Sequence, residues 1–158
     1  MAPLLLVATA PTQELHSYQV RRDLEYRTDS DAAEIHRLDL YVPEVDGPPL
    51  VMFVHGGTWR VGDKHGFGLV GKTLAEQGIA CAVIDFRQYP EVKHPTLVED
   101  CAHAFAWLLA NAAEHGCDPG QLFVMGHSSG AHRSFVGSRP SLPTSHRCRP
   151  RTHPRRHW

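Results

Sequence analysis

A serine lies in the run GHSSG at residues 126–130, where its spacing from two glycines is typical of a nucleophile elbow. A serine hydroxyl attacks a carbonyl efficiently only when a sharp turn presents its Oγ and a base takes its proton. The glycines on either side of Ser128 would remove Cβ atoms where such a turn crowds its neighbours. The run follows the apolar segment LFVM at 122–125 and precedes an expected helix, as an elbow requires. We therefore expect Ser128 to be a nucleophile.

A second run, HGG at residues 55–57, could stabilise the negative charge that develops on a carbonyl oxygen under attack. It follows another apolar segment, LVMFV at 50–54. Two consecutive glycines let a loop bend so that its backbone N–H groups face the reaction centre. We therefore expect an oxyanion hole made by the N–H groups of Gly56, Gly57 and Ser129, the last of them at the start of a helix.

Hydrophobic periodicity indicates the strands that would position these two runs. Two segments with alternating apolar residues predict strands, the first of them at the edge of a sheet. The wholly apolar segment at 50–54 predicts a strand that is buried on both faces, and the largely apolar segments at 79–86 and 122–125 predict two more buried strands. In chain order, the expected strands cover residues 18–28, 34–42, 50–54, 79–86 and 122–125.

Helices are expected between the last three of these strands. The first should end near Gln77, because Gly78 is a typical residue after a helix. The second should begin at a capping box formed by Thr96 and Glu99. Strands and helices that alternate in this way predict an α/β fold, with a mostly parallel sheet and helices on both faces.

Over residues 20–132 the chain resembles the HGG-type α/β-hydrolases. Among them it resembles the bacterial carboxylesterases related to hormone-sensitive lipase and, more closely, the group that includes kynurenine formamidases and prenylcysteine methylesterases. The resemblance is carried by FVHGGTW at 53–59, IDFRQYP at 84–90, ED at 99–100, CDP at 117–119 and MGHSSGAH at 125–132.

The resemblance implies the N-terminal part of an α/β-hydrolase fold and hydrolysis of a carboxylic ester through an acyl-enzyme on Ser128. It also implies the oxyanion hole at Gly56, Gly57 and Ser129, a small-molecule ester or amide as the substrate, and no cofactor or metal ion. Thr58 stands where many relatives have a third glycine or a small or aromatic residue. This departure leaves the subgroup and the acyl pocket open.

The catalytic triad of this family continues after the nucleophile with an acid and then a histidine, and here the sequence departs from the pattern. No Asp or Glu follows Asp118. His132 is not expected to lie above the Ser128 Oγ, and His55 is expected to brace the oxyanion loop. We therefore expect the triad Asp and His to be absent from this chain, and the chain to be weakly active or inactive.

The remaining acids have simpler expected roles. Asp63, Asp85, Asp100 and Asp118 are expected to be helix caps, loop ties or solvated charges. An inert chain would expose the apolar strand at 122–125 as an open sheet edge, which favours aggregation.

Charge separates the last residues from the rest of the chain. Residues 1–132 contain all 17 Asp and Glu, whereas residues 133–158 contain seven Arg, four Pro and no acid. We expect an N-terminal extension at 1–17, a partial α/β-hydrolase domain at 18–132, and a disordered Arg/Pro-rich tail at 133–158. The tail is interpreted as the aberrant, frame-shifted ending of a truncated hydrolase.

Two other functions stay open at this point. An arylformamidase-type amide hydrolase would use the same serine and the same oxyanion hole. A non-catalytic fragment could instead bind nucleic acid through its Arg-rich tail, with an affinity that falls as salt rises.

The sequence also bears on the compartment. Four cysteines without a CxxC pair favour free thiols in the cytoplasm, with export as the alternative because residues 1–10 are largely apolar. No apolar run is long enough to span a membrane, so no membrane partner is expected. The oligomeric state cannot be read from the sequence.

Overall fold

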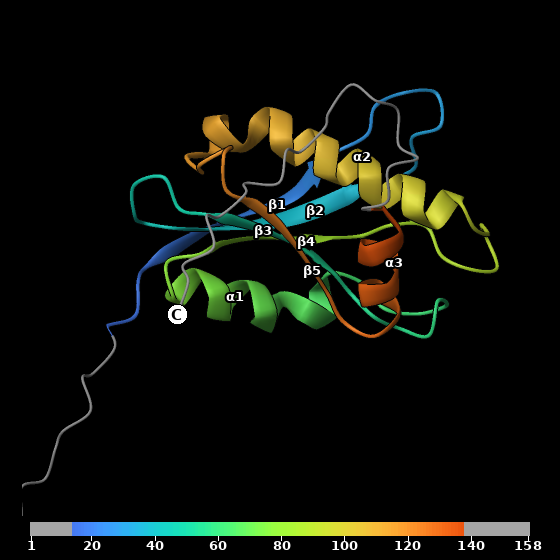
Figure 1. Cartoon of the computed structure of the whole chain (residues 1–158), viewed down its shortest axis with the longest axis horizontal. Coiled ribbons are helices and arrows are strands. Elements are labelled where there is room, and N and C mark those ends of the chain that lie inside the picture. The colour runs from blue at the N-terminus through green and yellow to red at the C-terminus, as the bar shows by residue number, and fades with distance from the viewer. Residues whose placement is uncertain (1–13, 138–158) are drawn as a thin grey trace, which may run out of the picture.

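The structure, a computed structural model, describes residues 14–137 (Figure 1). Within this range one sheet holds five strands in the order β1-β2-β4-β3-β5. The strands are β1 (Tyr18–Glu25), β2 (Arg37–Pro43), β3 (Leu50–Val54), β4 (Ala80–Ile84) and β5 (Leu122–Gly126). The helices are η1 (His65–Phe67), α1 (Gly68–Glu76), α2 (Thr96–Asn111), η2 (Ala112–His115) and α3 (Ser129–Gly137), where η marks a 3-10 helix.

The sheet is antiparallel at one end and parallel at the other. β1 pairs antiparallel with β2, and β2 pairs antiparallel with β4. β3 runs parallel to both β4 and β5. The three apolar segments thus form the parallel strands, because α1 and α2 return the chain to the same end of the sheet between them.

Helices α1 and α2 cover opposite faces of the sheet (Figure 1). Neighbouring strand residues alternate between these faces. Phe53 packs on the α1 side with Tyr41 and Val83, whereas Met52 and Val54 pack on the α2 side. The predicted α/β class, with helices on both faces, is confirmed.

The helix ends are partly as expected. α1 ends at Glu76, and Gly78 follows in the left-handed conformation with a φ of 79°. The capping box predicted at Thr96 is wrong, because Pro95 is the N-cap and no side chain caps the helix. The Pro95 carbonyl accepts from the backbone N–H groups of Val98, at 2.7 Å, and Glu99, at 3.2 Å. Thr96 therefore already lies inside the helix, where its hydroxyl cannot act as the N-cap acceptor.

Cys81, Cys101 and Cys117 are buried free thiols, as their apolar surroundings suggested. Burial raises the pKa of the Cys81 thiol to about 12, so this thiol stays protonated at neutral pH. No helix within residues 14–137 has the length and apolar character needed to cross a membrane. Cys148, most of the expected N-terminal extension and nearly all of the expected basic tail lie outside the described residues. The predictions made for them, nucleic-acid binding included, stay predictions.

Candidate active site

Pairing between β3 and β5 brings the two glycine-containing runs together. Val54 lies opposite Gly126, and the His127 N–H donates to the Val54 carbonyl at 3.1 Å. Because the strands are parallel, the loops that follow them leave the same edge of the sheet. A Cβ atom added to Gly56 would lie 2.9 Å from the His127 carbonyl oxygen and 3.1 Å from the Ser128 Cβ. The glycine loop therefore packs directly against the serine turn.

Ser128 sits in the turn between β5 and α3 with its side chain exposed. Its φ is 52°, in the left-handed region that a residue other than glycine seldom adopts. Such a conformation costs about 1–3 kcal/mol and persists only where the surroundings enforce it. Here they do, because a Cβ atom at Gly130 would lie 2.1 Å from the Val54 carbonyl oxygen. The turn is thus locked against the end of β3.

Three backbone N–H groups at this junction have no hydrogen-bond acceptor among the described residues. They belong to Gly56, Gly57 and Ser129, the residues predicted to form the oxyanion hole. The Ser129 N–H is the first in α3, and the first N–H groups of a helix have no partner inside it. None of the three donors is therefore occupied by another described residue.

His55 braces the glycine loop, as expected. It is fully buried, and its ring stacks on Phe86, with centroids 4.5 Å apart, and on Phe67, with centroids 5.5 Å apart. Its Nδ1 donates to the Gly56 carbonyl at 2.8 Å. In a trans peptide the N–H of Gly57 points away from the Gly56 carbonyl. The histidine therefore aims the Gly57 N–H away from itself.

The rest of the loop is strained. Thr58 and Trp59 have φ values of 50° and 71°, and a β-branched or bulky residue rarely adopts a positive φ. Thr58 occupies the place of the third glycine of many relatives, which this conformation would suit. The Tyr89 N–H donates to the Trp59 carbonyl at 3.0 Å, and the Gln88 side chain donates to the Gly62 carbonyl at 2.8 Å. These two bonds hold the strained segment in place.

The segment that carries Gln88 and Tyr89 is itself tied down by Asp100, which is fully buried in α2. Asp100 accepts from the Arg87 backbone N–H at 3.1 Å and from two nitrogens of its guanidinium at 3.0 and 2.7 Å. Burial opposes ionisation, but these bonds and the nearby His36 hold the pKa of Asp100 below its ordinary value. Of the roles expected for Asp100, the loop tie is confirmed and the solvated charge is wrong.

The other acids singled out in the sequence are loop ties. Asp85 accepts from the Lys64 backbone N–H at 2.6 Å, Asp63 from the Gly66 N–H at 3.0 Å, and Asp118 from the Gly120 N–H at 2.8 Å. The contacts of Asp63 and Asp118 are local turns that span three and two residues. The contact between Asp85 and Lys64 spans 21 residues, so sequence spacing could not reveal it.

The histidines nearest the serine in sequence are both exposed. His132 packs edge-on against Trp59, with ring centroids 5.1 Å apart, and His127 lies at a tilt 6.2 Å from Phe67. Neither forms an ion pair with a carboxylate of residues 14–137. His36 and His55 do adjoin carboxylates, at 3.1 and 3.7 Å, but both are fully buried. No Ser–His–acid arrangement is present within the described part of the chain.

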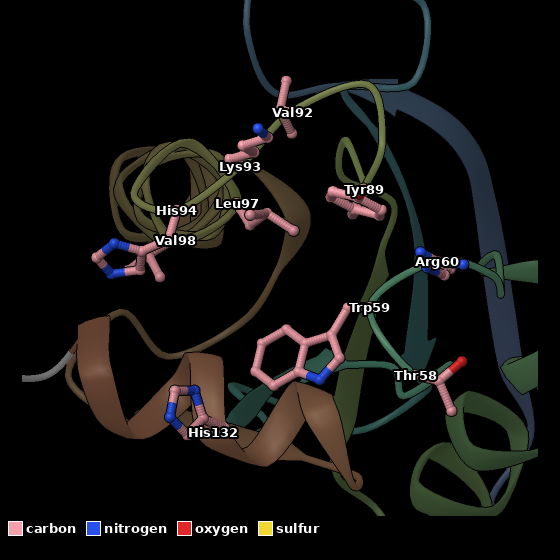
Figure 2. A pocket seen from close by; sticks show the side chains of 10 residues that line it. All are labelled: Thr58, Trp59, Arg60, Tyr89, Val92, Lys93, His94, Leu97, Val98 and His132. Carbon is pink, nitrogen blue, oxygen red and sulfur yellow. The ribbon is translucent and has the colours of Figure 1, made fainter.

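A cavity of about 350 Å³ opens beside the glycine loop (Figure 2). Its walls come from the glycine loop, the segment after β4, the start of α2, and α3. Its lining residues are Thr58, Trp59, Arg60, Tyr89, Val92, Lys93, His94, Leu97, Val98 and His132. No group of three or more His, Cys, Asp or Glu side chains within residues 14–137 is arranged to hold a metal ion.

Comparison with known proteins agrees with this arrangement. The profile of the family described as BD-FAE matches residues 38–139. A probable isoprenylcysteine alpha-carbonyl methylesterase of Oryza sativa subsp. japonica is 41% identical over 99 residues, which are 61% of this chain and 23% of that protein. A probable carboxylic ester hydrolase of Mycobacterium tuberculosis (strain ATCC 25618 / H37Rv) is 31% identical over 132 residues, or 78% of this chain and 31% of that protein.

Among solved structures, esterase B from Lactobacillus rhamnosis superposes with a TM-score of 0.71 at 24% identity. The match covers 79% of this chain and 40% of the esterase, and at this identity it shows a shared fold. The chain thus spans well under half the length of the relatives and the structure that it matches.

Proposed function

Because the chain belongs to the BD-FAE family of α/β-hydrolases, we propose that it carries the nucleophile and the oxyanion hole of a serine carboxylic ester hydrolase. The observation that carries the proposal is the junction of the two loops. There the strained turn at Ser128 lies against Gly56, and three backbone N–H groups have no acceptor within residues 14–137. Relatives named as a methylesterase and as a carboxylic ester hydrolase support an ester as the substrate class.

In the proposed reaction, the Ser128 Oγ attacks the carbonyl carbon of the ester and loses its proton as the new C–O bond forms. The carbonyl oxygen becomes an oxyanion, which accepts hydrogen bonds from the N–H groups of Gly56, Gly57 and Ser129. Collapse of this intermediate breaks the bond to the leaving oxygen, which takes up the proton that Ser128 released and departs as the alcohol. The acyl-enzyme that remains is then hydrolysed by water, which frees the carboxylic acid and returns a proton to the Ser128 Oγ. In comparable hydrolases, loss of one oxyanion donor slows the reaction about 10²–10³-fold.

The proton acceptor for Ser128 is the part of the reaction that the described residues leave unassigned. His127 and His132 adjoin the elbow but pair with no described carboxylate that could orient and stabilise an imidazolium. We therefore propose that the base is water or a group outside residues 14–137. With water as the base, we expect slow acylation of Ser128, because a serine hydroxyl at its ordinary pKa is a poor nucleophile.

A fluorophosphonate probe tests the proposal on the full 158-residue chain. We expect slow covalent labelling of the wild type, measured by mass spectrometry, and no labelling of Ser128→Ala. Peptide mapping should place the adduct on Ser128.

The neighbouring serine supplies the control. Ser129→Ala keeps the backbone N–H assigned to the proposed oxyanion hole and removes only a buried hydroxyl that has no hydrogen-bond partner within residues 14–137. It should be labelled at a rate close to that of the wild type. Equal labelling of the wild type and Ser128→Ala, or an adduct on another residue, would sink the proposal.

A further inference from the structure

The cavity beside the glycine loop lies within reach of Ser128. Two of its lining residues, Thr58 and Trp59, directly follow Gly57, and His132 lies one helical turn after the serine. A group bound there would be joined to a carbonyl at Ser128 by a short linkage. The volume of about 350 Å³ lies at the lower end of the range for small-molecule sites, about 300–1,000 Å³.

Most of the cavity wall is apolar. Trp59 is 40% exposed and Tyr89 is 37% exposed, which leaves aromatic surface available to a ligand. Figure 2 shows Leu97 extending from α2 toward these aromatic side chains. A ring or a branched alkyl group would bury this surface, and removing apolar surface from water favours binding.

Two positively charged side chains line the cavity without an ion-pair partner among the described residues. The Arg60 guanidinium lies 4.8 Å from the centre of the Tyr89 ring, and Lys93 is exposed at the start of α2. Neither forms an ion pair with a carboxylate of the described residues. The acidic residues nearest in sequence, Asp63 for Arg60 and Glu91 for Lys93, do not line the cavity.

Elsewhere among residues 14–132, each Lys and Arg side chain has a polar partner, which is a carboxylate in all but one case. Arg21 contacts His115. The Lys and Arg residues that form ion pairs with carboxylates are Arg22, Arg27, Arg37, Lys64, Lys72 and Arg87. Unpaired positive charge therefore gathers at the cavity, where it is complementary to an anion.

We propose that the cavity binds an aromatic or branched alkyl group that ends in a carboxylate, and that the positive charges of Arg60 and Lys93 favour this end group over a neutral or cationic one. We further propose that this group is part of the ester that Ser128 attacks. The second statement rests on the proposed function, whereas the first concerns binding and can be tested without turnover.

Three ligands that differ only in their end group test the binding. The full chain is titrated with 4-phenylbutyrate, 4-phenylbutanol and 4-phenylbutylammonium, and backbone amide chemical shifts report occupancy. We expect the carboxylate to bind more tightly than the alcohol, by up to about fivefold for each exposed cation, and the ammonium to bind most weakly. The preference should shrink in 1 M salt, where exposed charges are screened. Equal affinities for the three ligands would overturn the proposal.

Charge-neutral variants identify the groups responsible. In the double variant Arg60→Gln/Lys93→Gln, the carboxylate and the alcohol should bind equally, and the affinity for the alcohol should stay at the wild-type value. Lys72→Gln is the control, because Lys72 pairs with Glu76 on α1 and does not line the cavity. A carboxylate preference that survives in the double variant would contradict the assignment. Tyr89→Ala should weaken all three ligands alike.

The binding proposal and the proposed function can fail separately. If the carboxylate preference is observed but the fluorophosphonate does not label Ser128, the binding proposal is supported and the proposed serine hydrolase function is contradicted. If Ser128 is labelled but the three ligands bind alike, the reverse holds.

Discussion

β4 and β5 are both apolar strands of five residues, and they run parallel to β3 on either side of it. All five residues of β4 are buried, whereas every residue of β5 is at least partly exposed. β4 has β2 and β3 as neighbours, but β5 pairs only with β3 within residues 14–137. An apolar strand thus signals that burial is favourable, but its neighbours decide whether burial occurs.

The contrast continues into the site. After β4 comes Arg87, whose guanidinium donates to the buried Asp100. The next residue, Gln88, donates to the Gly62 carbonyl and so helps to anchor the glycine loop.

After β5 comes Ser128, the proposed reactive group. Phe123 and Val124 on β5 are 55% and 41% exposed. The segment that positions the glycine loop therefore follows the buried strand β4, whereas the proposed nucleophile follows the exposed strand β5.

The largest effect is expected at Asp100, beside the end of β4. Asp100→Asn would remove the buried anionic partner of the Arg87 guanidinium and leave it only the exposed Asp31, and breaking a buried ion pair costs about 3–5 kcal/mol. Urea unfolding should show this loss in the free energy of unfolding. Glu99→Gln, at the exposed neighbouring position in α2, is the matched control and should change it by about 0.5 kcal/mol or less.

Acid should remove the same contribution. The pKa of Asp100 is lower in the folded state than in the unfolded chain, where it is about 3.9. The stabilisation is therefore complete above this value and is lost as pH falls through the folded-state pKa. Between pH 7 and pH 3 the wild type should lose more unfolding free energy than Asp100→Asn. Parallel pH profiles for the two proteins would contradict this assignment.

A pair of identical substitutions tests the contrast between the strands directly. Val83 in β4 is fully buried and Val124 in β5 is 41% exposed. Val83→Ala should lower the free energy of unfolding by about 1.5–3 kcal/mol, because it removes buried methyl groups and leaves a cavity. Val124→Ala should cost about 0.5 kcal/mol. Similar losses at both positions would mean that β5 is covered in solution.

The smallest effect on stability is expected from Val124→Lys, which places a charge on the open edge. Its free energy of unfolding should stay within about 0.5 kcal/mol of the wild type. Its self-association, measured by sedimentation velocity, should decrease, because a lysine on an edge strand opposes strand pairing between molecules. Unchanged self-association would show that the molecules do not associate through the β5 edge.

Much of the fold was predictable because its signals are local. The apolar runs at 50–54, 79–86 and 122–125 coincide with β3, β4 and β5 to within a few residues, and alternation located β1 and β2. The start of α2 was misjudged because Pro95, just before the expected capping threonine, takes the N-cap position. Ser128 and the glycines around it were recognisable from spacing, since a tight turn restricts residue types within a few positions of itself.

The sequence by itself determined the strands, the glycine-dependent turns and the family, because sterics and periodicity act between residues close in the chain. Only the tertiary structure decided that Gly56 lies against Ser128, that Gln88 holds Gly62, and that Asp100 is buried beneath Arg87. It also decided that an apolar β5 is exposed. These features depend on the order of strands in the sheet, which brings distant segments together and which no local pattern encodes.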